Sequence, residues 1–250
     1  MIRRYLQAGV LERGLVEATN EGTPQGGPLS PILSNILLTD LDRELERRGH
    51  HFVRYADDSN IYVKSEHAGQ RVKASITRFL ETRLRLKVNE AKSAVAHPWQ
   101  RKFLGFRFTR RSRPRRRIAS QALTRFKQRV VELTDRNQGR ALAEVIGRLA
   151  VYLRGWRGYF GFCETPSVLR DLDSWLGRRL RSLVWKQWKR GRRRFAALVR
   201  RGVSRDLAAQ TAGSSHGPWR IAKSPALHIA LPTAYFAALG LPRLHVSPTA

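Results

Sequence analysis

Two adjacent acids, Asp57 and Asp58, stand between two short runs rich in aromatic and β-branched residues, 51–55 and 60–63. Two such runs joined by a short polar segment predict an antiparallel hairpin with the acids at its turn. Carboxylates at a hairpin tip can share divalent metal, and Mg²⁺ takes hard oxygen ligands of this kind. Two ions about 3.5–4 Å apart can activate a hydroxyl and stabilise a leaving pyrophosphate. The alternative is a plain polar turn, where Asp is common anyway.

The net charge of the chain points to a polyanionic partner. Lys and Arg number 48 against 19 Asp and Glu among 250 residues, a formal net charge of +29. Nucleic acid is the partner that this excess favours. A membrane surface is the rival, but no stretch approaches the roughly 18 apolar residues of a membrane span, so we expect no membrane partner. The single cysteine, Cys163, excludes internal disulfides and Cys-cluster zinc sites, and we expect a cytoplasmic protein.

The start of the chain is predicted to hold a helix, a stiff loop and a second helix. Residues 1–14 carry apolar side chains at helical spacing. The loop over 22–31 is rich in glycine and proline, and its adjacent glycines let a ligand approach the backbone. Ser30 and Pro31 suit the N-cap and the first position of the helix that follows. The alternative for the loop is a rigid cap on that helix.

Further elements follow the acidic hairpin. We predict a helix over 68–80, a short strand over 84–88 and a turn over 89–93. A strand over 103–106 carries a glycine at a point where another group comes close. The fold class of residues 1–110 is therefore α+β, with an antiparallel sheet under helices.

Residues 111–250 are predicted to be helical, with a boundary between domains inside 110–117. Three apolar stripes at helical spacing indicate the seams of a small bundle. Nine of the residues from 101 to 117 are Lys or Arg, and the third stripe is flanked by further basic residues. Like charges repel unless phosphates neutralise them. The candidate RNA-binding residues are Arg115, Arg116, Arg117, Lys186, Lys189 and Arg190. Most of the interleaved aromatics are expected in the core, and some to stack on unpaired bases.

Taken in order, these motifs resemble those of the reverse transcriptases encoded within bacterial group II introns, the intron maturases. The resemblance covers nearly the whole chain, and five motifs in the right order are far more specific than any one of them. The matched segments are 23–31 (nucleotide-pocket loop), 54–58 (catalytic palm hairpin), 86–93 (the segment after it), 103–106 (primer-grip hairpin), and 153–159 with 217–220 (the maturase region after the thumb).

The resemblance implies a partial reverse-transcriptase palm followed by an all-α thumb and maturase region. Asp57 and Asp58 would be catalytic and would bind two Mg²⁺ ions, and Lys92 would lie near the pyrophosphate as a general acid. The implied partners are group II intron RNA, an RNA template with a DNA primer, and dNTPs. Pro24, Gln25, Gly26, Tyr55 and Ala56 would line the nucleotide and template pocket, and Phe103, Leu104, Gly105 and Phe106 would hold the primer.

One metal ligand of the family has no counterpart in the sequence. The family takes a further Asp from an earlier palm strand, whereas the residues before Thr23 contain no Asp. We therefore expect a truncated remnant, the second half of a split protein, or a chain with a misplaced start codon. A separate N-terminal half or a second copy would complete the site in the second case. Because phosphoryl transfer depends on positioning and charge neutralisation, we expect the chain alone to be a poor polymerase.

Four functions stay open at this point. The first is an RNA-directed DNA polymerase with maturase activity, and the second is an inactive RNA-binding maturase fragment that assists splicing. The third is a reverse transcriptase of the retron or diversity-generating type, which the segments 153–159 and 217–220 disfavour. The fourth is a basic nucleic-acid binder in which the acidic pair does no chemistry.

Overall fold

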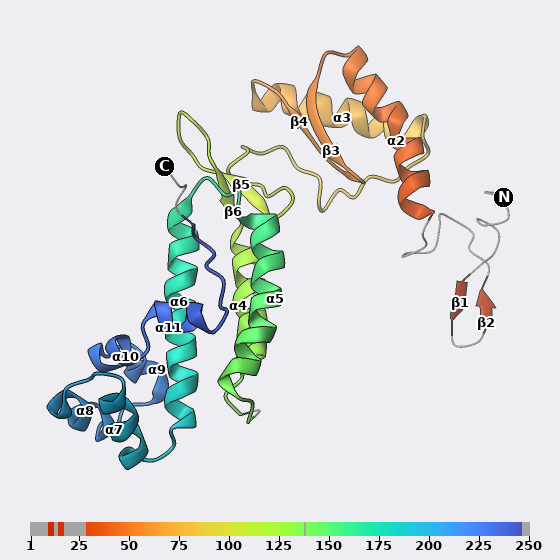
Figure 1. The fold of residues 1–250 in the computed structure, drawn as a ribbon. Coiled ribbons are helices and arrows are strands. Elements are labelled where there is room, and N and C mark those ends of the chain that lie inside the picture. The colour runs from red at the N-terminus through yellow and green to blue at the C-terminus, as the bar shows by residue number, and fades with distance from the viewer. Residues whose placement is uncertain (1–9, 13–14, 18–28, 138, 247–250) are drawn as a thin grey trace. The chain divides into compact units, whose positions relative to one another are not determined.

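The computed structural model describes residues 10–12, 15–17, 29–137 and 139–246, which form two compact units, Met1–Ala96 and His97–Ala250 (Figure 1). The strands described make three separate two-stranded antiparallel sheets, and the rest is mainly helical. An α+β fold with a helical second half is confirmed at this level. The two compact units divide between residues 96 and 97, before the boundary predicted inside 110–117. The reason is that the hairpin over 106–118 packs in the second unit. The division into functional domains at residue 110 stays a prediction.

The first strands are β1 (Val10–Glu12) and β2 (Leu15–Glu17), which pair antiparallel with Leu11 opposite Val16. The helix predicted over 1–14 is therefore wrong at the three residues of β1. A physical reason lies in the sequence, where Gly14, a poor helix former, stands just after this segment. The remainder of that prediction lies outside the described residues.

The core of the first unit joins α2 (Ser30–Arg47) and α3 (Glu66–Thr82) to a hairpin of β3 (His51–Tyr55) and β4 (Asp58–Tyr62). The predicted helices and the predicted hairpin are confirmed. Leu38, Leu41 and Leu45 recur at helical spacing and are buried with Ile76 of α3, while the cross-strand pair Phe52 and Ile61 packs against them.

The first turns of α2 differ from prediction. Its N-cap is Leu29, so Ser30 is the first helical residue, a shift of one position that is common at helix ends. Ile32 and Ile36, two apolar residues near the start of the helix, are 55% and 63% exposed. Only the stripe from Leu38 onward faces the core of the first unit.

The segment after α3 contains no strand at 84–88, contrary to prediction. A strand needs a neighbouring edge, and this segment instead folds back along α3. Leu86 N donates to Leu80 O over 2.9 Å, and Lys73 Nζ forms a 2.7 Å ion pair with Glu90. Leu84 and Leu86 still pack on the core, so the apolar pattern reports burial rather than a sheet.

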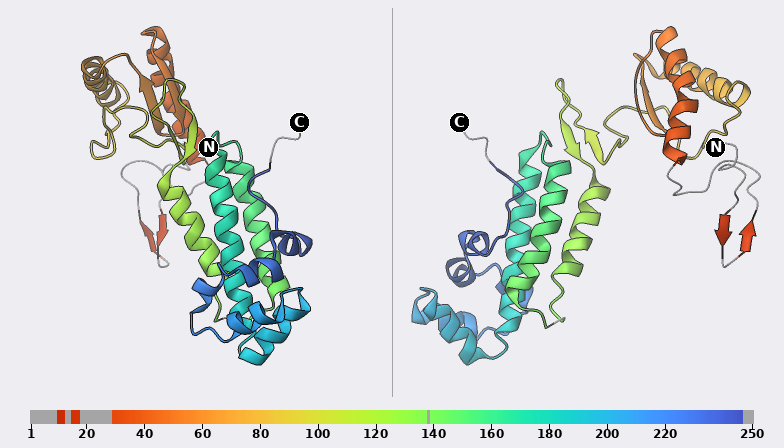
Figure 2. Two further views of the ribbon diagram at one scale, coloured as in Figure 1. Left: turned by 90° about the vertical axis from the view of Figure 1, so that its left-hand side faces the viewer. Right: turned by 45° about the vertical axis from the view of Figure 1, so that its right-hand side comes forward.

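The second unit is built on three long helices, α4 (Ser120–Leu133), α5 (Leu142–Phe160) and α6 (Pro166–Gln187), which lie side by side in both views of Figure 2. The three predicted stripes are confirmed as their core seams, with Phe126, Ile146 and Leu180 fully buried. A hairpin of β5 (Phe106–Phe108) and β6 (Arg116–Ile118) leads into α4.

Short helices at the C-terminal end close around α6. Buried Arg181 of α6 donates to Ala222 O over 3.0 Å. Ala222 follows the short helix over 218–221, and carbonyl groups at a helix end have no partner within the helix. The two carboxylate oxygens of Asp173 accept from the backbone N–H groups of Leu244 and His245, each over 2.9 Å. These helices are α7 (Gly191–Arg200), α8 (Arg205–Ala212), α9 (Pro218–Ile221), α10 (Pro225–Ala230) and α11 (Thr233–Ala238).

Candidate functional site

The acidic pair lies at the tip of the β3–β4 hairpin, as predicted. Tyr55 pairs directly with Asp58, so Ala56 and Asp57 form a two-residue loop and Asp58 is the first residue of β4. Tyr55, Ala56 and both acids are exposed. The turn therefore presents two carboxylates to solvent beside an aromatic ring that is 63% exposed.

The backbone at this turn is strained. Ala56 has a φ of +53°, in the left-handed region. For a residue with a Cβ atom this conformation costs roughly 1–2 kcal/mol, and strain of this kind persists where the surroundings hold it. The surroundings here are one arginine and the helix that it contacts.

Arg54 fastens the turn to α2. Its Nε donates to Asp42 Oδ1 over 2.8 Å and its Nη2 to Asp42 Oδ2 over 2.6 Å, the two-pronged contact that a guanidinium makes with a carboxylate. Its Nη1 donates to Asn35 Oδ1 over 2.9 Å and to the carbonyl oxygen of Ala56 over 2.8 Å. The hydrogen bonds with Asp42 raise the pKa of Arg54, which stays charged. One side chain thus fixes the strained residue next to the two acids.

Sequence reasoning missed Asn35 and Asp42, although a signal was present. Both recur at the spacing of Leu38 and Leu45 along α2. Asp42 is half-buried beside these leucines, and Asn35 is exposed in the turn before them. A half-buried carboxylate such as Asp42 needs a polar partner, and Arg54 of the adjacent strand supplies it.

The acidic turn has the donor chemistry that Mg²⁺ prefers, namely carboxylate oxygens, and one or two protein carboxylates are its usual share. In the described ranges, no group of three or more His, Cys, Asp or Glu side chains comes together as a metal site. The residues therefore fit a metal that is completed by water, substrate phosphates or a ligand from elsewhere.

The structure describes only some of the other residues predicted for the site. Lys92 is exposed in the turn 89–93, where its backbone N–H donates to the carbonyl and the side-chain oxygen of Asn89, each over 3.1 Å. Its role as a general acid stays a prediction. Pro24, Gln25 and Gly26 lie outside the described residues.

The predicted strand over 103–106 is instead a tight turn. Phe103 and Phe106 exchange backbone hydrogen bonds of 2.8 and 2.9 Å, while Leu104 and Gly105 adopt φ values of +50° and +76°. A Cβ added at Gly105 would lie 3.0 Å from the Phe160 ring, so the prediction that something comes close to this glycine is confirmed. Phe106 is buried, Phe103 and Gly105 are half-buried, and Leu104 is exposed; the role of this segment in holding a primer stays a prediction.

The basic residues of β6 point in different directions. Arg116 and Arg117 of β6 and Arg115 just before it are all exposed. Arg116 also contacts Glu164 through its backbone N–H over 2.6 Å and its Nε over 3.2 Å. Those hydrogen bonds lower the pKa of Glu164. The guanidinium of Arg116 also lies 5.1 Å from the Phe162 ring centroid.

The basic residues at the end of α6 and just after it are exposed as well. Lys189 and Arg190 lead into α7, and Lys186 Nζ donates to Asn137 Oδ1 over 2.5 Å. The nearby tryptophans are mainly structural, since Trp185 and Trp188 are buried. These positions stay candidates for RNA contact.

The segment 217–220 is held on α6. Arg178 donates to Trp219 O through Nε over 3.1 Å and Nη2 over 2.9 Å, and its guanidinium lies 3.9 Å from the ring centroid of Trp219. This part of the maturase-like sequence therefore has a structural role in the second unit.

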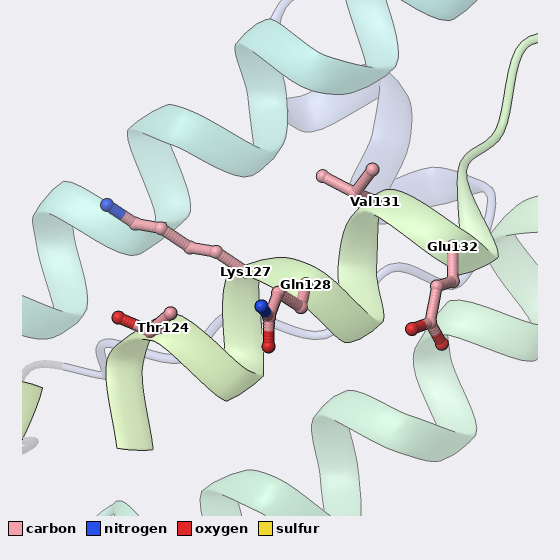
Figure 3. Close-up of a pocket in the computed structure, with 5 residues that line it drawn as sticks. All are labelled: Thr124, Lys127, Gln128, Val131 and Glu132. Carbon is pink, nitrogen blue, oxygen red and sulfur yellow. The ribbon is translucent and has the colours of Figure 1, made fainter. Parts of the chain in front are cut away.

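A shallow depression on α4 offers no second candidate for catalysis (Figure 3). Its lining carries one acid, Glu132, and one amine, Lys127, whose Nζ lies 5.8 Å from the ring centroid of Trp175 on α6. Glu132 forms a 2.6 Å ion pair with Arg129. Paired acids of the kind found at the β3–β4 turn do not line this depression.

Comparison with known families agrees with this division of the chain. Residues 1–108 match the family described as reverse transcriptase (RNA-dependent DNA polymerase), and residues 123–202 match the group II intron, maturase-specific domain. The chain belongs to the group II intron reverse transcriptases and maturases. The first match contains the acidic turn, and the second contains α5 and α6.

Two curated relatives show the same likeness. The group II intron-encoded protein LtrA of Lactococcus lactis subsp. cremoris is 27% identical over 171 residues, which covers 42% of this chain and 28% of LtrA. Protein YkfC of Escherichia coli (strain K12) is 29% identical over 131 residues, which covers 39% of this chain and 34% of YkfC. The chain thus spans about a third of the length of these relatives. Among the described helices, none is long and apolar enough to cross a membrane.

Proposed function

We propose that this group II intron family member acts in RNA-directed DNA synthesis and in binding intron RNA, with Asp57 and Asp58 as the metal-binding acids. The observation that carries the proposal is the exposed acidic turn, whose strained backbone is fixed to α2 by Arg54. Two-residue hairpin turns often need a positive φ, which Gly or Asn usually supplies. Here an alanine adopts it, and a guanidinium nitrogen binds its carbonyl oxygen.

The residues of the turn have separate roles in this proposal. Asp57 and Asp58 would hold Mg²⁺, and the chemistry that this ion would supply is activation of a primer hydroxyl and stabilisation of the leaving pyrophosphate. Arg54 keeps the carboxylates in place without contacting substrate, because its donors are used by Asp42, Asn35 and Ala56. The second unit supplies basic surface for an RNA backbone.

Metal binding at the turn can be tested on the full chain by NMR with Mn²⁺ as a paramagnetic probe. We expect the amide signals of residues 56–59 to broaden first, and the selective broadening to vanish in Asp57→Asn/Asp58→Asn. A matched control, Asp171→Asn/Asp206→Asn, removes two exposed acids of the second unit and should leave the broadening unchanged. Uniform broadening over all exposed acids would overturn the metal assignment.

A second candidate function is an RNA-binding maturase without DNA synthesis. It is favoured by the match of residues 123–202 to the maturase-specific domain, a segment that does not contain the acidic turn. Under this alternative, Asp57→Asn/Asp58→Asn leaves RNA affinity and splicing assistance unchanged. A loss of either in that variant would argue against it.

A further inference from the structure

The β5–β6 hairpin contains a pair of like charges that lowers its own stability. Arg107 and Arg117 lie directly opposite each other on the two strands. Thr109 N donates to Arg115 O over 3.0 Å and Ala119 N to Gly105 O over 2.8 Å. These bonds make Arg107 and Arg117 the hydrogen-bonded pair of the ladder, in which Cα atoms lie about 5.5 Å apart. Like charges directly opposite each other destabilise a hairpin.

Nothing in the described part of the chain offsets this repulsion. Both side chains are exposed, and neither guanidinium has an ion-pair, hydrogen-bond or ring partner among the described residues. The sequence contains no Asp or Glu from residue 91 to residue 131. The pair is therefore an uncompensated double positive charge on one face of a two-stranded sheet.

The neighbouring arginine of β6 shows the contrast. Arg116 has its side chain on the other face, where Glu164 accepts from its Nε and Phe162 lies beneath its guanidinium. The fold thus neutralises Arg116 and leaves Arg107 and Arg117 open. On the neutralised face, Phe106 and Ile118 are buried and anchor the hairpin to the second unit.

We propose that Arg107 and Arg117 together clamp one phosphate of a nucleic-acid backbone. Two planar guanidinium groups from opposed positions can converge on the oxygens of a single phosphate, each donating two hydrogen bonds. The bound phosphate converts the repulsion of the free hairpin into attraction. This inference rests on the proposed function for RNA binding as such, and adds to it a defined phosphate site with Arg107 as a member.

The test is a double-mutant cycle on the full chain, with a labelled single-stranded RNA of mixed sequence as the probe. Arg107→Gln and Arg117→Gln should each weaken binding about five- to tenfold near physiological salt, and each should reduce the salt dependence by about one phosphate contact. Because both residues hold the same phosphate, the double variant should bind about as well as either single variant.

Arg113→Gln is the matched control, since it removes one exposed arginine from the loop of the same hairpin. Combined with Arg107→Gln, its effect should be additive. Two results would overturn the clamp while leaving RNA binding intact. The first is that the affinity losses of Arg107→Gln and Arg117→Gln are also additive. The second is that each loss equals that of Arg113→Gln alone. Absence of RNA binding by the unaltered chain would instead overturn the proposed function.

A second measurement uses the chain without RNA. Arg107→Gln and Arg117→Gln should slow amide hydrogen exchange in residues 106–118 at low salt, because each removes the cross-strand repulsion, and the gain should fade at high salt. Arg113→Gln should not slow it. Loss of binding to phosphatidylglycerol vesicles, with RNA binding unchanged, would assign the pair to a membrane surface and overturn the clamp.

Discussion

Arg54 shows how a single residue can decide the geometry of the acidic turn. Its guanidinium holds Asp42 of α2 with two donors and the carbonyl of Ala56 with a third nitrogen. Lysine carries the same charge on a single ammonium group and cannot reproduce the planar fork. The contribution of Arg54 is therefore geometric as well as electrostatic.

Arg54→Lys should loosen the turn while the first unit stays folded. Losing one charge-assisted hydrogen bond costs about 1.5–3 kcal/mol, so local amide exchange at residues 56–58 should speed up at least about tenfold. Mn²⁺ affinity at the acids should fall, and RNA affinity should stay. The control is Arg47→Lys, which disrupts a similar fork on Glu44 within α2. Unchanged exchange at the turn would contradict a positioning role for Arg54.

Among the elements, the β5–β6 hairpin is attached to α5 through contacts that allow little change. Gly105 adopts a φ of +76° with the Phe160 ring against it, and Tyr159 Oη donates to Leu104 O over 3.0 Å. Backbone conformation and ring contact both exclude a larger residue at this position.

Gly105→Ala should lower the free energy of unfolding by about 2–4 kcal/mol, the sum of a left-handed alanine and an overpacked contact. Urea unfolding of the second unit measures it. Gly139→Ala separates the two effects, since Gly139 has a φ of +66° and no neighbour within 4 Å of an added Cβ. Equal losses in the two variants would show that the Phe160 contact carries no energy.

Helix α2 contains a carboxylate whose titration should be visible in acid. Hydrogen bonds from Arg47 and then Arg48 lower the pKa of Glu44 from 4.5 to about 2. Because the folded pKa is the lower one, the stabilisation is complete above about pH 4.5 and is lost as pH falls toward 2. A carboxyl NMR titration should give this low pKa, and Glu44→Gln should flatten the pH dependence of α2 stability. A pKa near 4.5 would contradict the forked contact.

At the scale of the whole molecule, local patterns predicted the helices and not the contacts between elements. The stripes of α4, α5 and α6 follow from a repeat within each segment, and so does the hairpin around the acids. Residues 84–88 alternate like a strand but have no partner edge, so they pack on α3 instead. Leu104 gives no hint of its positive φ, because a leucine rarely adopts it.

The candidate site divides in the same way. The acids were predictable from a short motif, whereas their support by Arg54, Asp42 and Asn35 joins residues from separate elements. The opposition of Arg107 and Arg117 likewise depends on hairpin register, which a run of basic residues does not specify. Net charge alone predicts a nucleic-acid partner. The register shows that Arg116 has an acidic neighbour, whereas Arg107 and Arg117 face each other without one among the described residues.

The most direct test of the central claim is Mg²⁺-dependent primer extension on an RNA template by the purified 250-residue chain. We expect weak extension that disappears in Asp57→Asn/Asp58→Asn and persists in Asp171→Asn/Asp206→Asn. Extension that survives loss of the two turn acids would contradict their catalytic role. Tight RNA binding without any extension would contradict DNA synthesis by this chain and leave the maturase-like RNA-binding function.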